Sequence, residues 1–140
     1  MTRILLAARE TLAALTGRVD ALGLWKDYVP ALSGVTVGNG VLQGRYYQTG
    51  KTVHFAVDLA AGSTTALTGL VSIGFPVPAL PWTAIGSGFR LGTGGNGILG
   101  WRAAGGAGLY VYDSAGASWG AATPFAAGAF LRVSGTYEAS

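Results

Sequence analysis

The sequence has no cysteine, a single histidine and few charged residues, and these shortages narrow the functions open to it. Without cysteine there can be no disulfide bond and no thiolate metal site. Charged residues make up 11% of the 140 residues, against about 25% in an ordinary soluble domain. The nine Lys and Arg residues are scattered along the chain, so we expect no nucleic-acid partner.

Long apolar segments are also missing. The longest stretch without a charge, residues 59–89, is interrupted by Pro76, Pro78 and Pro81, so we expect no insertion into a membrane. Near the start of the chain, Arg9 and Glu10 end the apolar run too early for a signal peptide. These features predict a soluble chain that is made in the cytoplasm.

Glycine and apolar residues are abundant instead. The chain has 24 glycines and 50% hydrophobic residues, and its mean hydropathy is +0.43. Many glycines and few charges favour a β-protein with many tight turns. So much apolar surface is usually covered by another subunit, so we expect an oligomer or a protein docked on a larger assembly.

Residues 1–23 differ from the rest of the chain because leucine and alanine recur there with heptad spacing. The candidate oligomerisation residues at the a and d positions are Leu5, Ala8, Leu12, Leu15, Val19 and Leu22. Thr2 and Gly23 are suitable capping residues at the two ends. A helix of about 20 residues is marginal alone in water, so it must pack on something. The heptad favours a parallel bundle of several copies, without fixing their number, and packing on its own subunit is the alternative.

After Gly23 the pattern becomes β-like and remains so to the end of the chain. We predict strands at Val29–Val37, Val41–Gln48, Thr52–Leu59, Leu67–Phe75, Ala84–Leu91, Ile98–Arg102, Leu109–Asp113 and Phe130–Glu138. About eight short strands without intervening helices indicate an antiparallel β-sandwich of jelly-roll type. The expected fold is thus mainly β: a short N-terminal helix over residues 1–23, followed by a β-sandwich knob over residues 24–140.

Two glycine motifs imitate nucleotide-binding loops. The segment Gly50-Lys51-Thr52 resembles the end of a P-loop, but Arg45 stands where the first glycine is required. Residues 92–97 fit G-x-G-x-x-G, but the residues that follow predict a strand where a dinucleotide site needs a helix. We therefore predict a hairpin at Gly50 and a glycine-rich loop at residues 92–97, and we expect no nucleotide cofactor.

The sequence offers no catalytic constellation. His54 and Asp58 lie four residues apart on one expected strand, about 13 Å at the usual strand rise, which is too far for a hydrogen-bonded pair. No G-x-S-x-G elbow occurs. We therefore predict a protein that is not an enzyme and has no metal, although symmetry-related copies of His54 around an axis could meet and hold an ion.

The aromatic residues are the remaining candidates for ligand binding. Trp82 follows a proline-rich loop and Trp119 follows a turn, and Trp101 lies in an expected strand. The rings of Trp82, Trp101 and Trp119 are candidate ligand-facing groups, for a sugar or a protein. The alternative is that these rings fill the core or a subunit interface.

Several short segments, in order, resemble a β-domain of tailed-bacteriophage virion proteins. They are residues 25–36, Gly38-Asn39-Gly40, Gly44-Arg45-Tyr46, residues 50–53, residues 62–65, residues 73–77, residues 112–114, residues 122–125 and residues 131–138. Such domains occur in minor tail proteins, fibre tips, and head fibres or capsid decorations, usually as trimers behind a helical stalk.

The resemblance implies a structural protein: a homotrimeric knob on the virion exterior that contacts other virion proteins of the capsid or tail. Residues 1–23 would then serve for trimerisation and attachment. The alternative function is that of a host-surface receptor-binding module at a fibre tip, which recognises glycans through its loop aromatics.

Overall fold

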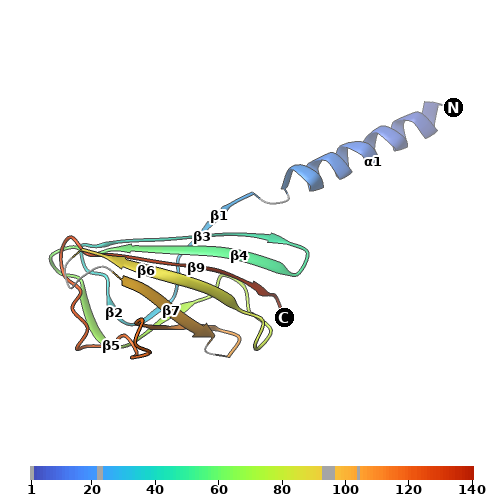
Figure 1. Ribbon diagram of the computed structural model, residues 1–140. Coiled ribbons are helices and arrows are strands. Elements are labelled where there is room, and N and C mark those ends of the chain that lie inside the picture. Colours follow the sequence, from blue (N-terminus) through green and yellow to red (C-terminus); the bar gives the residue numbers. More distant parts are fainter. Residues whose placement is uncertain (1, 22–23, 93–96, 104) are drawn as a thin grey trace.

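The computed structural model describes residues 2–21, 24–92, 97–103 and 105–140, and it consists of a helix and a β-body. Helix α1 (Thr2–Ala21) projects away from the β-body, as Figure 1 shows. The expectation of a mainly β chain with one short N-terminal helix is therefore confirmed. The strands are β1 (Lys26–Tyr28), β2 (Leu32–Thr36), β3 (Val41–Thr49), β4 (Thr52–Ala60), β5 (Ala66–Gly74), β6 (Ile85–Leu91), β7 (Gly97–Ala103), β8 (Gly108–Tyr112) and β9 (Phe130–Glu138).

The strands form a sandwich-like pair of layers. Their order by hydrogen bonding is β1-β3-β4-β9-β6-β7-β8-β5-β2, and the described pairs are antiparallel. Strands β1, β3, β4, β9 and β6 make one layer, which we call layer A, and β8, β5 and β2 make layer B (Figure 1). Strand β7 joins the two layers, because Leu99 pairs with Gly88 of β6 whereas Trp101 pairs with Val111 of β8.

The core lies between the two layers and follows the period-two pattern of the strands. In β4 the buried side chains alternate, and those of Val53, Phe55, Val57 and Leu59 are at most 2% exposed. Layer B supplies the buried side chains of Val71, Ile73, Leu109 and Val111 from the other side. Because alternate residues of layer A point away from this core, its outer face carries a second, independent set of side chains.

One predicted strand was wrong in its bounds. Instead of one strand over residues 29–37, the chain forms β1 and β2 with a break around Pro30. Proline has no N–H to donate to a ladder, so it interrupts the pairing and lets the chain cross from layer A to layer B. Gly34, at φ 73°, then produces a shift of register within β2.

Two of the short motifs face each other across a turn. The Asn39 backbone N–H donates to Thr64 Oγ1 at 2.8 Å, and the Thr64 N–H donates back to Asn39 Oδ1 at 2.9 Å. Asn39 Nδ2 also donates to Ser63 Oγ at 2.8 Å. A Cβ on Gly62 would overlap Asn39, so glycine is required there. Residues 38–40 and 62–65 therefore form a polar clasp between two turns, which is a structural role.

The two nucleotide-like motifs are turns. Residues Gly50 and Lys51 connect β3 to β4 as a two-residue hairpin, with Gly50 at φ 58°. Residues 93–96 of the second motif lie outside the described residues, but Gly92 has φ 92° and β7 begins at Gly97. The predicted hairpin at Gly50 is confirmed, and a strand follows the second motif as expected.

Candidate functional site

The first candidate surface is the apolar seam of helix α1. Leu5, Leu12 and Leu15 are 62%, 65% and 51% exposed, and Ala8 on the same line is exposed as well. The side chain of Val19 and all of Leu22 lie outside the described part of the chain. Burying one leucine side chain is worth about 1.5–3 kcal/mol. The leucines of the described seam are not buried within one chain, so contact with another chain could supply this burial energy.

The second candidate surface is the outer face of layer A. Four of its large apolar side chains, those of Trp25, Val41, Ile85 and Leu91, are between 47% and 72% exposed. They lie near the margins of a face whose centre carries small residues such as Ala56 and Ser134, paired directly across β4 and β9. A broad face of this kind, with apolar margins, has the character of a protein-contact surface.

An aromatic row crosses this outer face beside the point where the helix joins the body. The Trp25 ring meets the Tyr47 ring edge-on at 4.8 Å between centroids, and Tyr47 stacks on His54 at 4.5 Å. The Arg45 guanidinium lies 4.7 Å from the Trp25 ring centroid. His54 Nδ1 is 2.8 Å from Thr136 Oγ1 on the neighbouring strand. His54 is thus held by the row and by Thr136.

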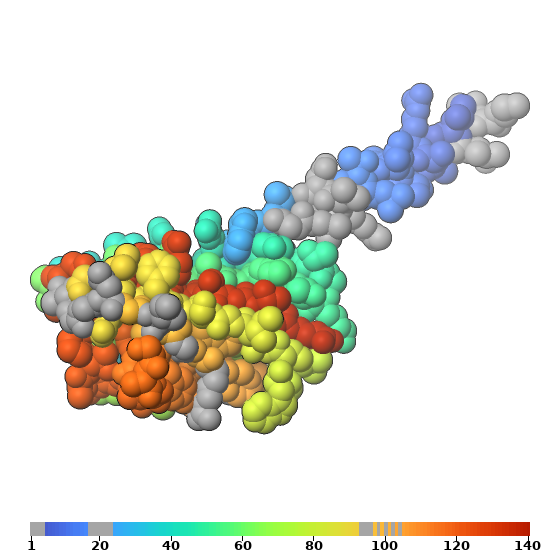
Figure 2. Space-filling model, viewed as in Figure 1, coloured from blue at the N-terminus to red at the C-terminus, as the bar shows by residue number. Residues whose placement is uncertain are grey.

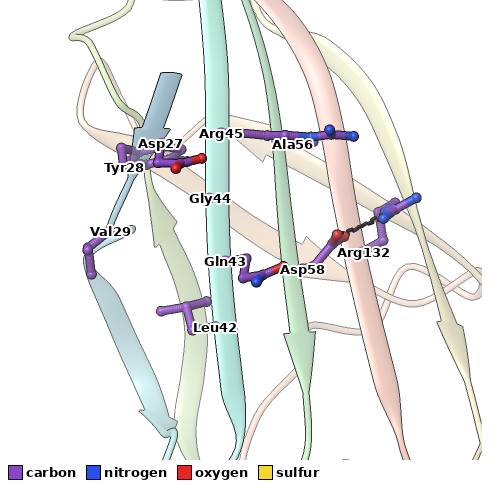
Figure 3. A pocket seen from close by; sticks show the side chains of 10 residues that line it. All are labelled: Asp27, Tyr28, Val29, Leu42, Gln43, Gly44, Arg45, Ala56, Asp58 and Arg132. Carbon is purple, nitrogen blue, oxygen red and sulfur yellow. Dashed lines mark hydrogen bonds and ion pairs between the residues drawn. The ribbon is translucent and has the colours of Figure 1, made fainter. Parts of the chain in front are cut away.

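A groove on layer A contains the ion pair of the outer face (Figure 3). Its volume is about 610 Å³, and it is lined by Asp27, Tyr28, Val29, Leu42, Gln43, Gly44, Arg45, Ala56, Asp58 and Arg132. Arg132 donates from Nε to Asp58 Oδ1 and from a terminal nitrogen to Asp58 Oδ2, both at 2.6 Å. Both carboxylate oxygens of Asp58 are therefore occupied by one guanidinium.

Two ionisable groups that line this groove, Arg132 and Tyr28, have a raised pKa. The hydrogen bond to Asp58 raises the pKa of Arg132 above its ordinary value, so this group stays charged. Burial raises the pKa of the Tyr28 phenol, whose hydroxyl donates to the Gly74 carbonyl oxygen at 3.3 Å. Within the described residues, no group of three or more His, Cys, Asp or Glu side chains could hold a metal ion.

Two of the three tryptophans proposed to face a ligand belong to the interior. Trp119 is 1% exposed and packs against Phe125 at 5.6 Å between ring centroids. Trp101 packs against Phe55 at 5.6 Å, and its indole N–H donates to the Ser134 carbonyl oxygen at 3.2 Å. The prediction that Trp101 and Trp119 face a ligand was wrong for the single chain, because both rings fill space between the layers.

Trp82 is the most exposed of the described tryptophans. Trp82 is 97% exposed, and its backbone has φ 68°, a left-handed conformation that residues other than glycine rarely adopt. Both features cost free energy, since a large apolar ring stays in water and the backbone is strained. An outlier of this kind at a loop tip is a candidate binding residue.

We expect Trp82→Gly to stabilise the fold. Glycine relieves the left-handed strain, which stabilises the fold by about 1–2 kcal/mol. It also makes the unfolded chain more flexible, which destabilises the fold by about 0.5–1 kcal/mol. The exposed ring loses almost no packing. The net gain of about 0.5–1 kcal/mol corresponds to a rise in Tm of ~2–4 °C, measured by circular dichroism. Trp82→Ala keeps the strain and is the matched control, with a Tm close to that of the wild type; a lower Tm for Trp82→Gly contradicts the assignment.

Neither the ion pair nor the aromatic row has a direct signal in the sequence, because both depend on strand register. Asp58 and Arg132 are directly paired in the β4–β9 ladder, 74 residues apart in the chain. Tyr47 and His54 are likewise paired in the β3–β4 hairpin. Counting outward from the two-residue turn at Gly50 places Tyr47 beside His54, so the hairpin could have revealed that half of the row.

The described residues include no helix with the length and apolar content needed to span a bilayer. No protein-family model, no curated protein and no solved structure matches the chain.

Proposed function

We propose that this chain is a structural protein of a bacteriophage particle: a homotrimeric β-knob on the virion exterior, assembled through helix α1. The observation that carries the proposal is the projecting helix with an exposed heptad seam, in which Leu12 and Leu15 are 65% and 51% exposed. A 20-residue helix is marginal by itself in water. Association of several copies along the seam supplies the burial that the single chain lacks.

The position of the helix supports contact between the β-bodies as well. Leu24 and Trp25, which are 58% and 47% exposed, connect the helix to β1 at the margin of layer A. Helices that associate in parallel bring these residues of each copy close to the common axis. The outer face of layer A, with its exposed Val41 and Leu91, is then available as a second contact area between copies or with another virion protein.

The assignment to a phage particle rests on the resemblance of the short segments between Trp25 and Glu138 to virion β-domains. The same resemblance supports three copies, a capsid-decoration, head-fibre or minor tail position, and contacts with other virion proteins. The jelly-roll connectivity expected of such knobs stays a prediction for this chain. The bidentate Asp58–Arg132 pair favours a structural role over an enzymatic one, because it engages both oxygens of a carboxylate in the groove on layer A.

The molar mass of the full chain in solution, measured by light scattering, tests the assembly. We expect a value close to three times the 14.2 kDa of one chain, and a fall in mass when residues 1–23 are removed. A mass of one chain for the full-length protein overturns the trimer. Immunogold labelling of purified particles of the phage that encodes the chain tests the location, with label expected on the particle exterior.

A further inference from the structure

The loop between β5 and β6 ends in a turn that presents Trp82. The turn runs from Leu80 to Thr83: the Thr83 N–H lies 3.5 Å from the Leu80 carbonyl oxygen, and Thr83 Oγ1 donates to the same oxygen at 2.9 Å. Pro81 occupies the second position, and Trp82, at φ 68°, the third. This is the dihedral pattern of a type II turn, where glycine is the usual third residue. A tryptophan stands here where glycine fits best.

The stem of this loop is fixed to the body, so the turn is a rigid support. The Leu80 N–H donates to the Glu138 carbonyl oxygen at 2.7 Å, and the Glu138 N–H donates to Thr83 Oγ1 at 3.0 Å. Other hydrogen bonds join the stem to the body: Ala79 N to Gly106 O at 2.9 Å, Ser140 N to Pro78 O at 3.0 Å, and Tyr137 Oη to Val77 O at 2.6 Å. Binding of a ligand to the indole therefore carries little entropic cost for ordering the loop.

A groove with both polar and apolar lining begins at the residue after the tryptophan. Its volume is about 350 Å³, and it is lined by Lys51, Thr52, Thr83, Ile85, Thr136, Tyr137 and Glu138. The Lys51 ammonium can donate hydrogen bonds, the Glu138 carboxylate can accept them, and the Thr52 hydroxyl can do both. In Figure 2 the loop that leads to this groove protrudes from the lower right of the body. The exposed indole thus belongs to the residue directly before Thr83, which lines a groove with mixed donors and acceptors.

We propose that Trp82 and this groove form a saccharide-binding site. A pyranose ring has one apolar face of C–H groups, which can stack on the indole, and a rim of hydroxyls that need both donors and acceptors. The buried core of a protein–protein interface would place further apolar side chains around the tryptophan. The groove offers mainly Lys, Thr and Glu side chains, with Ile85 as the exposed aliphatic contribution. All residues of this site belong to one chain.

An array of immobilised oligosaccharides tests the site with the full-length protein. The probes are the hexasaccharides of α-1,4-glucose, β-1,4-glucose, N-acetylglucosamine and mannose, each coupled to serum albumin, with uncoupled albumin as the protein control. We expect retention on at least one saccharide and none on albumin alone. Retention on none of the four, or equal retention on albumin, overturns the proposal.

Substitutions then locate the binding on the surface. Trp82→Gly is expected to weaken binding about tenfold or more, and Lys51→Met or Glu138→Gln by a smaller factor. Because glycine suits the backbone at this position, loss of binding by Trp82→Gly cannot be attributed to unfolding. Trp25→Phe alters another exposed tryptophan and is expected to bind like the wild type. Undiminished binding by Trp82→Gly contradicts the assignment.

Discussion

Replacing Leu12 and Leu15 together by aspartate is expected to convert the protein from an oligomer into single chains. Both side chains are exposed in the single chain, at 65% and 51%, so the substitution removes no contact described within it. In a helical bundle the same positions form the seam, and two carboxylates per chain would be buried there without partners. Light scattering should show the mass of the variant falling about threefold, to that of one chain.

A matched control separates the seam from a general effect of acidic residues on the helix. Leu6 and Ala13 lie one position after Leu5 and Leu12, so they point away from the a/d line. Leu6 is 59% exposed, much like the seam leucines. The double variant Leu6→Asp with Ala13→Asp should keep the mass of the wild type. An unchanged mass for the seam variant, with a folded β-body by circular dichroism, would remove the helix as the site of assembly.

Local patterns predicted the elements of this fold well. Strand β4 was recognisable because large apolar residues occupy alternate positions of its nine residues, and these residues, Val53, Phe55, Val57 and Leu59, are buried. Helix α1 was recognisable from its heptad spacing, and its range, Thr2–Ala21, stops two residues before Gly23, the predicted cap, which lies outside the described residues. The exception was the segment around Pro30. Its sequence has the pattern of one continuous strand, although the chain changes from layer A to layer B there.

The candidate site was predicted less well, because exposure depends on which face a strand residue occupies in the assembled layers. Trp82, Trp101 and Trp119 look alike in the sequence, since each lies near turn residues or glycines. Their exposures differ because Trp82 occupies the tip of a turn whereas Trp119 is covered by Phe125. A left-handed tryptophan is also invisible in a sequence, because the residue expected at such a position is glycine.

Trp101 packs on a pair of glycines that lie on two neighbouring strands. Gly86 of β6 and Gly135 of β9 are directly opposite each other, and Gly135 is also opposite the buried Phe55. A Cβ on either glycine would overlap Cζ2 of Trp101. The indole thus rests on bare backbone, and its N–H reaches the Ser134 carbonyl oxygen. The two glycines and the tryptophan are one packing unit, although they are far apart in the chain.

This unit makes Gly135→Ala a substitution with a large expected loss of stability. The added methyl group would overlap both Trp101 Cζ2 and the Ile85 carbonyl oxygen, and the latter belongs to a paired strand that cannot move away alone. Overpacking of a core costs about 1–3 kcal/mol when side chains can adjust. Because backbone is involved here, we expect about 3 kcal/mol and a fall in Tm of ~10 °C, measured by thermal unfolding.

Gly69→Ala is the matched control, since Gly69 also lies inside a strand, β5, but its nearest neighbour would be the Cα of Gly34 at 3.8 Å from the new methyl group. Alanine is favoured over glycine within a strand for reasons of backbone entropy, so this variant should unfold at the temperature of the wild type or slightly above it. If Gly135→Ala lost no more stability than Gly69→Ala, the indole could not lie against the glycine pair. Trp101 would then again be a candidate for contact with a ligand.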